Sequence, residues 1–244
     1  MTESKTTLGG KVAIVTGAGT GVGRATALAL AAEGVATVLV GRRRDLLEET
    51  GALIAAAGGT PLVAPADVAD EIAVSDVVAR AIAQFGGVDI LINAAAVGLY
   101  GPVERYPLHA WQQTLATNLT GVFLFCRAVL PSMRERGGGA IVSIGSGAGK
   151  QGYADLAAYS ASKFGLIGFM QSLAAEVGDD GIKVSTILPG SILTDFGGRS
   201  VAEKLAAVAA GKRYLNPEDV ADAVLFLLRQ PPHAWTQELN LWPF

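Results

Sequence analysis

The sequence of 244 residues contains few of the side chains that disulfides and metal sites need. It has one cysteine, Cys126, and two histidines, His109 and His233. One cysteine cannot form an internal disulfide. Because histidines and carboxylates do not cluster at ligand spacing, we also expect no metal site. Cys126 lies in the apolar run 122–126, which indicates a packing role rather than a nucleophilic one.

The chain also lacks an excess of charge of either sign. Its 19 Lys and Arg residues nearly balance 22 Asp and Glu residues, so it lacks the basic footprint of a nucleic-acid-binding protein. Its first ten residues are polar, without the apolar core of a signal peptide, and uncharged apolar stretches stay below the ~18 residues of a membrane span. We therefore expect a cytoplasmic protein that acts on a small molecule, with no nucleic-acid or membrane partner.

Continuous apolar runs alternate with alanine-rich helical patterns along the whole chain. Such runs are typical of strands buried on both faces of a parallel sheet, and the alternation favours a doubly wound α/β arrangement. We predict a single domain over residues 1–244, a Rossmann fold with a parallel seven-stranded sheet and helices on both faces. The expected strands are 12–16, 36–40, 61–64, 88–93, 140–144, 183–188 and 238–241, and the expected helices are 23–33, 46–57, 69–85, 110–136, 157–177, 201–210 and 217–229.

Residues 191–215 form a connection that is long for a compact domain. They follow a predicted strand end, at the edge where sheets of this kind bind ligands. We expect a substrate lid here, and a surface insertion without a role is the alternative.

A glycine-rich turn follows the first predicted strand and leads directly into a helix. Glycines at 17, 21 and 23 let the backbone approach a pyrophosphate, and the N-terminus of the helix favours the anion. The turn lacks the lysine of a nucleoside-triphosphate P-loop. At the end of the second strand stands Arg42, where an acidic residue would bind the ribose 2′-hydroxyl of NAD. Because arginine can pair with a 2′-phosphate, we favour NADP over NAD, with a solvated helix start as the alternative reading of this arginine.

Tyr159 and Lys163 stand four residues apart on a predicted helix, so they share one face of it. An ammonium beside a phenol favours the phenolate, so we expect the Tyr159 pKa to fall below its usual value of about 10. Such a phenol can exchange a proton near neutral pH. Ser146, thirteen residues before Tyr159, carries a hydroxyl that can polarise a carbonyl oxygen.

Together these residues resemble the classical short-chain dehydrogenase/reductase family over about residues 9–242. The resemblance implies that Ser146, Tyr159, Lys163 and Asn118 are catalytic. It also implies a cofactor site formed by Gly17, Thr20, Gly21, Val22, Gly23, Arg42, Asp67, Val68, Asn93, Tyr159, Lys163, Pro189, Gly190, Ile192 and Thr194. The chain departs from the family pattern at Ala94 and Ala96, and it lacks the usual Asp-Gly after the last strand.

The resemblance also implies a mechanism of direct hydride transfer between a nicotinamide and a carbonyl carbon. Tyr159 would donate the proton, Ser146 would hold the carbonyl oxygen, and Lys163 would bind the nicotinamide ribose. Asn118 would bend its helix locally and hold a water that connects Lys163 to solvent. The family is usually oligomeric, so we expect a homotetramer or homodimer, with Trp242 and Phe244 packing either on a neighbouring subunit or locally.

The leading interpretation is an NADP-dependent carbonyl reductase or alcohol dehydrogenase acting on a neutral ketone or secondary alcohol. Within the enzymes, the alternative is a 3-oxoacyl-[acyl-carrier-protein] reductase, for which three arginines at 127, 134 and 136 offer part of a basic docking patch. In a different class, the alternative is a dinucleotide-binding protein without catalytic activity. The expected walls of the substrate site are 96–100, 147–156 and the segment from 191, with Lys150 as the one cation close to Ser146.

Overall fold

A computed structural model describes residues 7–244; residues 1–6 of the predicted domain lie outside the described residues. Seven parallel strands form one sheet in the order β3-β2-β1-β4-β5-β6-β7. The chain therefore runs outward from β1 in one direction and then from β4 in the other. In doubly wound sheets, ligands bind outside the carboxyl ends of the strands at this switch point, which lies here between β1 and β4.

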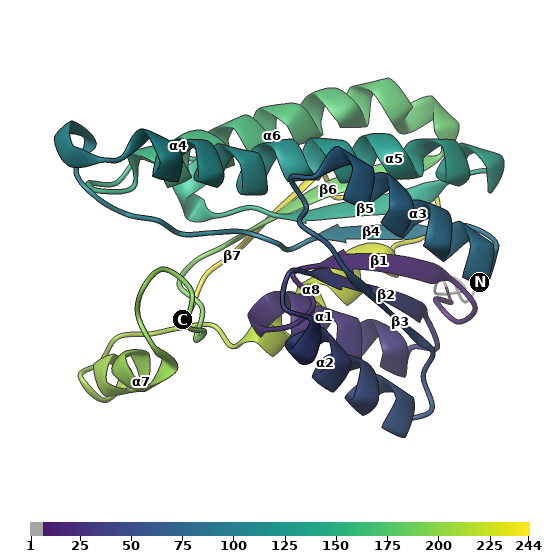
Figure 1. Cartoon of the computed structure of the whole chain (residues 1–244), viewed down its shortest axis with the longest axis horizontal. Coiled ribbons are helices and arrows are strands. Elements are labelled where there is room, and N and C mark those ends of the chain that lie inside the picture. The colour runs from purple at the N-terminus through teal and green to yellow at the C-terminus, as the bar shows by residue number, and fades with distance from the viewer. Residues whose placement is uncertain (1–6) are drawn as a thin grey trace.

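The helices cover both faces of the sheet, as Figure 1 shows. On one face lie α3, α4, α5 and α6, on the other α1, α2 and α8, whereas α7 stands apart near the C-terminus. The strands are β1 Val12–Thr16, β2 Ala36–Gly41, β3 Pro61–Pro65, β4 Ile90–Asn93, β5 Gly139–Ile144, β6 Ile182–Pro189 and β7 Glu238–Leu241. The helices are α1 Gly21–Ala32, α2 Arg44–Ala56, α3 Glu71–Phe85, α4 Leu108–Leu115, α5 Gly121–Glu135, α6 Ala157–Val177, α7 Val201–Ala209 and α8 Pro217–Leu228.

Each face of the sheet has its own hydrophobic core, which explains why the strands read as continuous apolar runs. Along β1, Ile14 packs into the core under α3, α5 and α6, and Ala13 and Val15 pack into the core under α1 and α8. All five residues of β1 are buried. Because successive side chains of a strand point to opposite faces, a strand covered on both faces needs apolar residues at every position. The predicted fold class is confirmed.

The predicted helix 110–136 is one continuous helical stretch with an irregular turn inside it. Residues Ala116–Thr120 adopt a π-helical turn between α4 and α5. Such turns are frequent at functional sites, and this one carries Asn118. The stretch Leu108–Glu135 is long and apolar enough to cross a membrane, but half of its apolar window is buried within the protein. A helix that packs against a sheet passes the same test, so we interpret this one as a core helix.

Candidate active site

The glycine turn after β1 makes a tight cradle at the switch point. Gly17 has a φ of +71°, and a Cβ there would lie 2.9 Å from the amide nitrogen of Ala95. At Gly23, a Cβ would meet the carbonyl oxygen of Gly17 at 2.2 Å. In the part of the chain that the structure describes, the N-cap residue Thr20 makes no side-chain capping bond. The first amides of α1 therefore point to the cradle uncapped, which suits a pyrophosphate.

Thr16, the last residue of β1, joins this cradle to the loop after β4. Its Oγ1 accepts hydrogen bonds from the amides of Ala94 at 3.0 Å and Ala95 at 3.1 Å. The two loops on either side of the switch point are thus fixed to each other. Sequence reasoning missed this residue, although a polar side chain at the end of an apolar strand was a usable signal.

The arginine cluster after β2 lies beside the same cradle. Arg42 is exposed, and the guanidinium that reaches over the glycine turn belongs to the next residue, Arg43. Its Nη2 donates to the Oγ1 of Thr20 at 3.4 Å, a contact at the long end of the hydrogen-bond range. Arg43 therefore joins Arg42 as a candidate for holding a 2′-phosphate.

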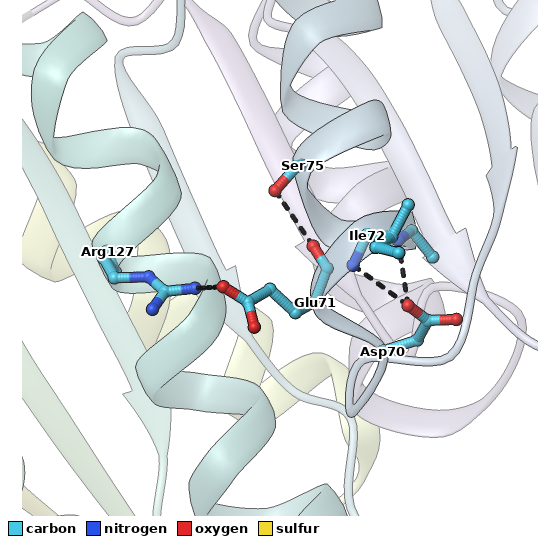
Figure 2. Close-up of polar contacts among 6 residues, drawn as sticks. Asp70, Glu71, Ile72, Ser75 and Arg127 are labelled. Atoms are coloured by element: carbon cyan, nitrogen blue, oxygen red, sulfur yellow. Dashed lines mark hydrogen bonds and ion pairs between the residues drawn. The ribbon is translucent and has the colours of Figure 1, made fainter.

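The segment after β3 is fixed by the N-terminus of α3. Figure 2 shows Asp70 capping this helix and Glu71 reaching across to Arg127 on α5. Val68 is buried against α5, where a Cβ at Gly121 would lie 2.7 Å from its Cγ2. Asp67 remains exposed, and its Oδ1 accepts from the amide of Ala69 at 3.0 Å. These two residues are therefore placed at the carboxyl edge, where the resemblance expects the adenine.

Asn93, at the end of β4, turns its side chain into the protein. Its Nδ2 donates to the Oγ of Ser143 on β5 at 3.1 Å, and only 3% of the residue is exposed. The side chain therefore braces β4 against β5. Because this side chain is occupied inside the protein, only the backbone of Asn93 is placed to contact a cofactor.

Ser146, Tyr159 and Lys163 come together at the carboxyl end of β5. Ser146 lies just beyond the strand, and its Oγ accepts from the amide of Ala148 at 3.1 Å. Tyr159 and Lys163 share one face of α6, with the Lys163 Nζ 5.7 Å from the centroid of the Tyr159 ring. The ammonium also donates to the carbonyl oxygen of Ile144 at 2.8 Å, which fixes it beside the end of β5.

The protonation of this group differs from the expectation that Lys163 acidifies Tyr159. Tyr159 is only 8% exposed, and its pKa is raised above the usual value, first by burial and then by the nearby Tyr100, while a hydrogen bond with Ser146 opposes the rise. Burial also lowers the pKa of Lys163 to about 8. Desolvation disfavours both charged forms, and it is the largest cause of both shifts. In this arrangement the neutral phenol dominates.

Asn118 links the π-helical turn to two neighbouring segments. Its Oδ1 accepts from the amide of Val97 at 2.8 Å, and its Nδ2 donates to the carbonyl oxygen of Val97 at 3.0 Å and to the Oγ of Ser162 at 3.1 Å. The side chain therefore holds the loop after β4 against α6, next to Lys163. The expected helix irregularity is present at this residue, and the water relay stays a prediction.

Two aromatic rings cover Tyr159. The ring of Tyr100 lies edge-on at 5.8 Å, and the ring of Phe196 lies tilted at 5.8 Å. Tyr100 comes from the loop after β4, and Phe196 comes from the segment 191–215 that we expect to be a lid. A cavity of about 510 Å³ lies beside Tyr100, lined by residues 98–102 and 105–107, Ala110, Gly197 and Gly198.

Comparison with known proteins agrees with this geometry. Residues 11–205 match the short chain dehydrogenase family. The chain is a short-chain dehydrogenase. It is 39% identical over 224 residues to D-threitol dehydrogenase from Mycolicibacterium smegmatis, covering 90% of this chain and 86% of that protein. It is also 37% identical over 231 residues to the 3-oxoacyl-[acyl-carrier-protein] reductase of Synechocystis, covering 94% of each.

Larger proteins and solved structures contain the same unit. The chain matches a glycine betaine reductase from Emericella nidulans with 36% identity over 97% of its length but spans only 19% of that protein. A metagenomic short-chain oxidoreductase in complex with NADP superposes with a TM-score of 0.85 at 33% identity, covering 98% of this chain and 99% of the other. The family and the oxidoreductase class are therefore established for this chain.

In this short-chain dehydrogenase the end of β6 and the C-terminus pack together. Trp242 lies against Gly147 and Gly190, where added Cβ atoms would be 2.7 and 2.9 Å from its ring. Thr194 lies over the glycine cradle, with its Cγ2 3.2 Å from where a Cβ of Gly21 would be. Trp242 therefore makes local contacts, but 56% of the residue is exposed, so its packing on a neighbouring subunit stays a prediction. Pro189, Ile192 and Thr194 thus belong to the same edge as the cradle.

Proposed function

We propose that this dehydrogenase interconverts a ketone or aldehyde and the corresponding alcohol, with NADP as its cofactor. The observation that carries the proposal is the meeting of Tyr159, Ser146 and Lys163 beside a glycine cradle at the switch point of the sheet. A proton donor, a carbonyl-binding hydroxyl and a dinucleotide cradle are the parts that carbonyl reduction needs.

NADP is favoured over NAD by the charge around the cradle. Gly41 ends β2, where a carboxylate would repel a 2′-phosphate, and Arg42 and Arg43 follow it. Arg43 already lies over Thr20, so it needs little rearrangement to pair with a phosphate there. The related oxidoreductase solved with NADP supports the same choice.

Bound at this edge, the nicotinamide supplies or accepts the hydride. In the reductive direction Tyr159 donates its phenolic proton to the carbonyl oxygen, and the hydroxyl of Ser146 holds that oxygen in place. Lys163 binds the nicotinamide ribose. Its ammonium also stabilises the Tyr159 phenolate that remains after the proton has been donated. Asn118 keeps the loop after β4 and α6 in register around this group. Burial raises the pKa of Tyr159, so the phenol is protonated before it donates but is a weaker acid than in water.

The substrate is proposed to be neutral and partly apolar. Lys150, the cation that lies near Ser146 besides Lys163, forms an ion pair with Glu238 at 2.7 Å, so its charge is already neutralised. Tyr100 and Phe196 provide aromatic walls over Tyr159, and we propose that residues 191–215 form the lid that carries one of them. A ring-bearing ketone suits these walls better than a multiply charged one.

Replacing Tyr159 by Phe tests the function directly. We expect Tyr159→Phe to lose nearly all turnover of ketones while NADPH still binds, as followed by the quenching of tryptophan fluorescence. Tyr214→Phe, a matched change in the segment 191–215, should keep activity. Wild-type protein that binds NADPH but turns over none of a panel of cyclic, aryl and aliphatic ketones would instead support a dinucleotide-binding protein without catalytic activity.

A 3-oxoacyl-[acyl-carrier-protein] reductase is the second candidate, because the Synechocystis relative carries that name. Its acidic carrier would need basic side chains on the surface. All three candidate arginines are paired with carboxylates: Arg127 with Glu71 at 2.5 Å, Arg134 with Asp180 at 2.7 Å and Arg136 with Asp89 at 2.8 Å. Higher kcat/KM for an acetoacetyl thioester than for cyclic or aryl ketones would favour this candidate over the first.

We also propose that the enzyme is a cytoplasmic homotetramer or homodimer. Phe123 on α5 and Phe164 on α6 leave 40% and 48% of their surfaces exposed on the helical layer. Burial of such rings between two copies is favourable. Sedimentation velocity at micromolar concentration tests the oligomeric state.

A further inference from the structure

A buried lysine lies at the centre of the segment 191–215, away from the candidate catalytic group. Lys204 is on α7 and is only 7% exposed. Its Nζ donates to three backbone carbonyl oxygens, those of Ile192 at 3.3 Å, Thr194 at 2.5 Å and Phe196 at 3.0 Å. An ammonium has three protons to donate, so these contacts satisfy all of them.

The three carbonyl groups belong to alternate residues that reach opposite sides of the site. Thr194 lies over the glycine cradle through its contact with Gly21, and Phe196 packs on the ring of Tyr159. The backbone of Ile192 also bridges to Leu215, at the far end of the segment. One ammonium therefore binds the cofactor side and the substrate side of the segment at the same time.

The helix that carries Lys204, α7, is itself fixed to the segment 192–196 that Lys204 contacts. Ser200 and Glu203 form a capping box at the start of α7, and the Oδ1 of Asp195 accepts from the amide of Val201 at 2.7 Å. The first turn of α7 is thus held in place by two independent contacts. This places the Lys204 stem so that its ammonium enters the curve of residues 192–196.

The chemistry of burial makes these contacts mutually dependent. A buried ammonium without acceptors is costly, and so are buried carbonyl groups without donors. Asp195 stabilises the charge, whereas Arg199 and Lys212 oppose it, so the nearby charges do not by themselves hold the ammonium in place. The lysine and the curved backbone of 192–196 are therefore expected to order together.

We propose that Lys204 is a positioning residue that shapes residues 192–196, so that the same backbone curve holds Thr194 over the glycine cradle and Phe196 against Tyr159. Lys204 acts through the backbone and touches neither reactant. The proposal rests on the proposed oxidoreductase function for its kinetic part, whereas its structural part concerns the protein alone.

Hydrogen exchange of the full-length protein, without and with NADPH, tests the structural part. Lys204→Met keeps the length of the stem and removes the donors. We expect exchange of amides within 192–201 to speed up by at least about tenfold, since several charge-assisted bonds are lost, while β1 and β4 stay protected. NADPH should bind more weakly, and KM for the ketone should rise more than kcat falls. Lys204→Arg, which keeps a charged donor, should restore part of each effect.

Lys212→Met is the matched control, because Lys212 is an exposed lysine of the same segment and solvent screens its weak repulsion of the Lys204 charge. It should leave exchange and kinetics as in the wild type. Unchanged exchange of 192–201 in Lys204→Met overturns the proposal. Faster exchange spread equally over β1 and β4, without recovery in Lys204→Arg, also overturns it, because Lys204 would then support general stability. If exchange responds as expected but the wild type reduces no ketone, the proposed function fails and the positioning role stands.

Discussion

Cofactor choice offers the sharpest test of the arginines beside the glycine cradle. Replacing Arg43 by Gln removes the charge and the guanidinium tip but keeps a polar, unbranched side chain. Its guanidinium donates to Thr20 at the edge of the cradle, so a 2′-phosphate bound there would gain a charge-assisted hydrogen bond from it. NADH lacks this phosphate and should be affected little.

The size of the effect follows from the exposure of the site. A hydrogen bond to a charged group contributes about 1.5–3 kcal/mol, but solvent screens an exposed arginine, so we expect about 1–2 kcal/mol for Arg43→Gln. This free energy corresponds to about a five- to thirtyfold rise in the ratio of KM for NADPH to KM for NADH. The effect should shrink as the salt concentration rises from 50 to 500 mM, because the Debye length then falls from about 14 Å to about 4 Å.

The assay is the initial rate of ketone reduction with each cofactor, measured on the wild type and on matched single variants. Arg42→Gln measures the share of the neighbouring arginine, and Arg44→Gln is the control, because Arg44 pairs with Glu48 on the surface of α2. Equal losses with NADPH and NADH in Arg43→Gln would refute the reasoning, because the arginine would then act on the cradle rather than on a phosphate. If only Arg42→Gln raises the ratio of KM values, Arg42 rather than Arg43 pairs with the 2′-phosphate, as the sequence indicated.

Three further predictions concern folding and the cradle. Burial lowers the pKa of Lys163 from 10.5 to about 8, so between these pH values the unfolded chain binds more protons than the folded one. The free energy of unfolding should therefore rise with pH across this window. Urea unfolding should show that the rise is about 3 kcal/mol larger in the wild type than in Lys163→Met. Gly23→Ala should weaken NADPH binding and lower the free energy of unfolding by at least about 2 kcal/mol, because a Cβ would meet the carbonyl oxygen of Gly17 at 2.2 Å. Gly178→Ala is the matched control: Gly178 has an αR conformation and open space around it, so thermal unfolding should show a stabilisation of about 0.5 kcal/mol. Thr16→Val keeps the shape of the side chain but leaves two amides without their acceptor, so a loss of about 1–3 kcal/mol is expected, with NADPH titration showing a weaker cradle.

Much of the fold could be predicted because local pattern and global layer agree. The apolar run 12–16 predicted a strand correctly because β1 is covered on both faces. The glycine turn could be predicted because a Cβ has no room at Gly17 or Gly23. Boundaries shifted where a cap decides them. The third helix was expected from residue 69 but begins at Glu71, because Asp70 accepts from the amides of Ile72 and Ala73.

The candidate site was predictable in its residue types but not in its electrostatics. The four-residue spacing of Tyr159 and Lys163 correctly placed them on one helix face. Their pKa values depend on how much water the neighbouring loops exclude, and those loops come from residues near 100 and 196. Exclusion of water by segments distant in sequence has no signature in local spacing, so the direction of the Tyr159 shift was predicted wrongly.

The sequence by itself determined the alternating architecture, the glycine turn and the family, because each depends on residue type and short-range spacing. Only the tertiary structure decided which arginine lies over the turn, which carboxylates neutralise the basic side chains, and that Lys204 is buried among three carbonyl groups. These features depend on contacts between segments far apart along the chain. Folding sets such distances through the packing of whole elements, and the one-dimensional pattern does not contain them.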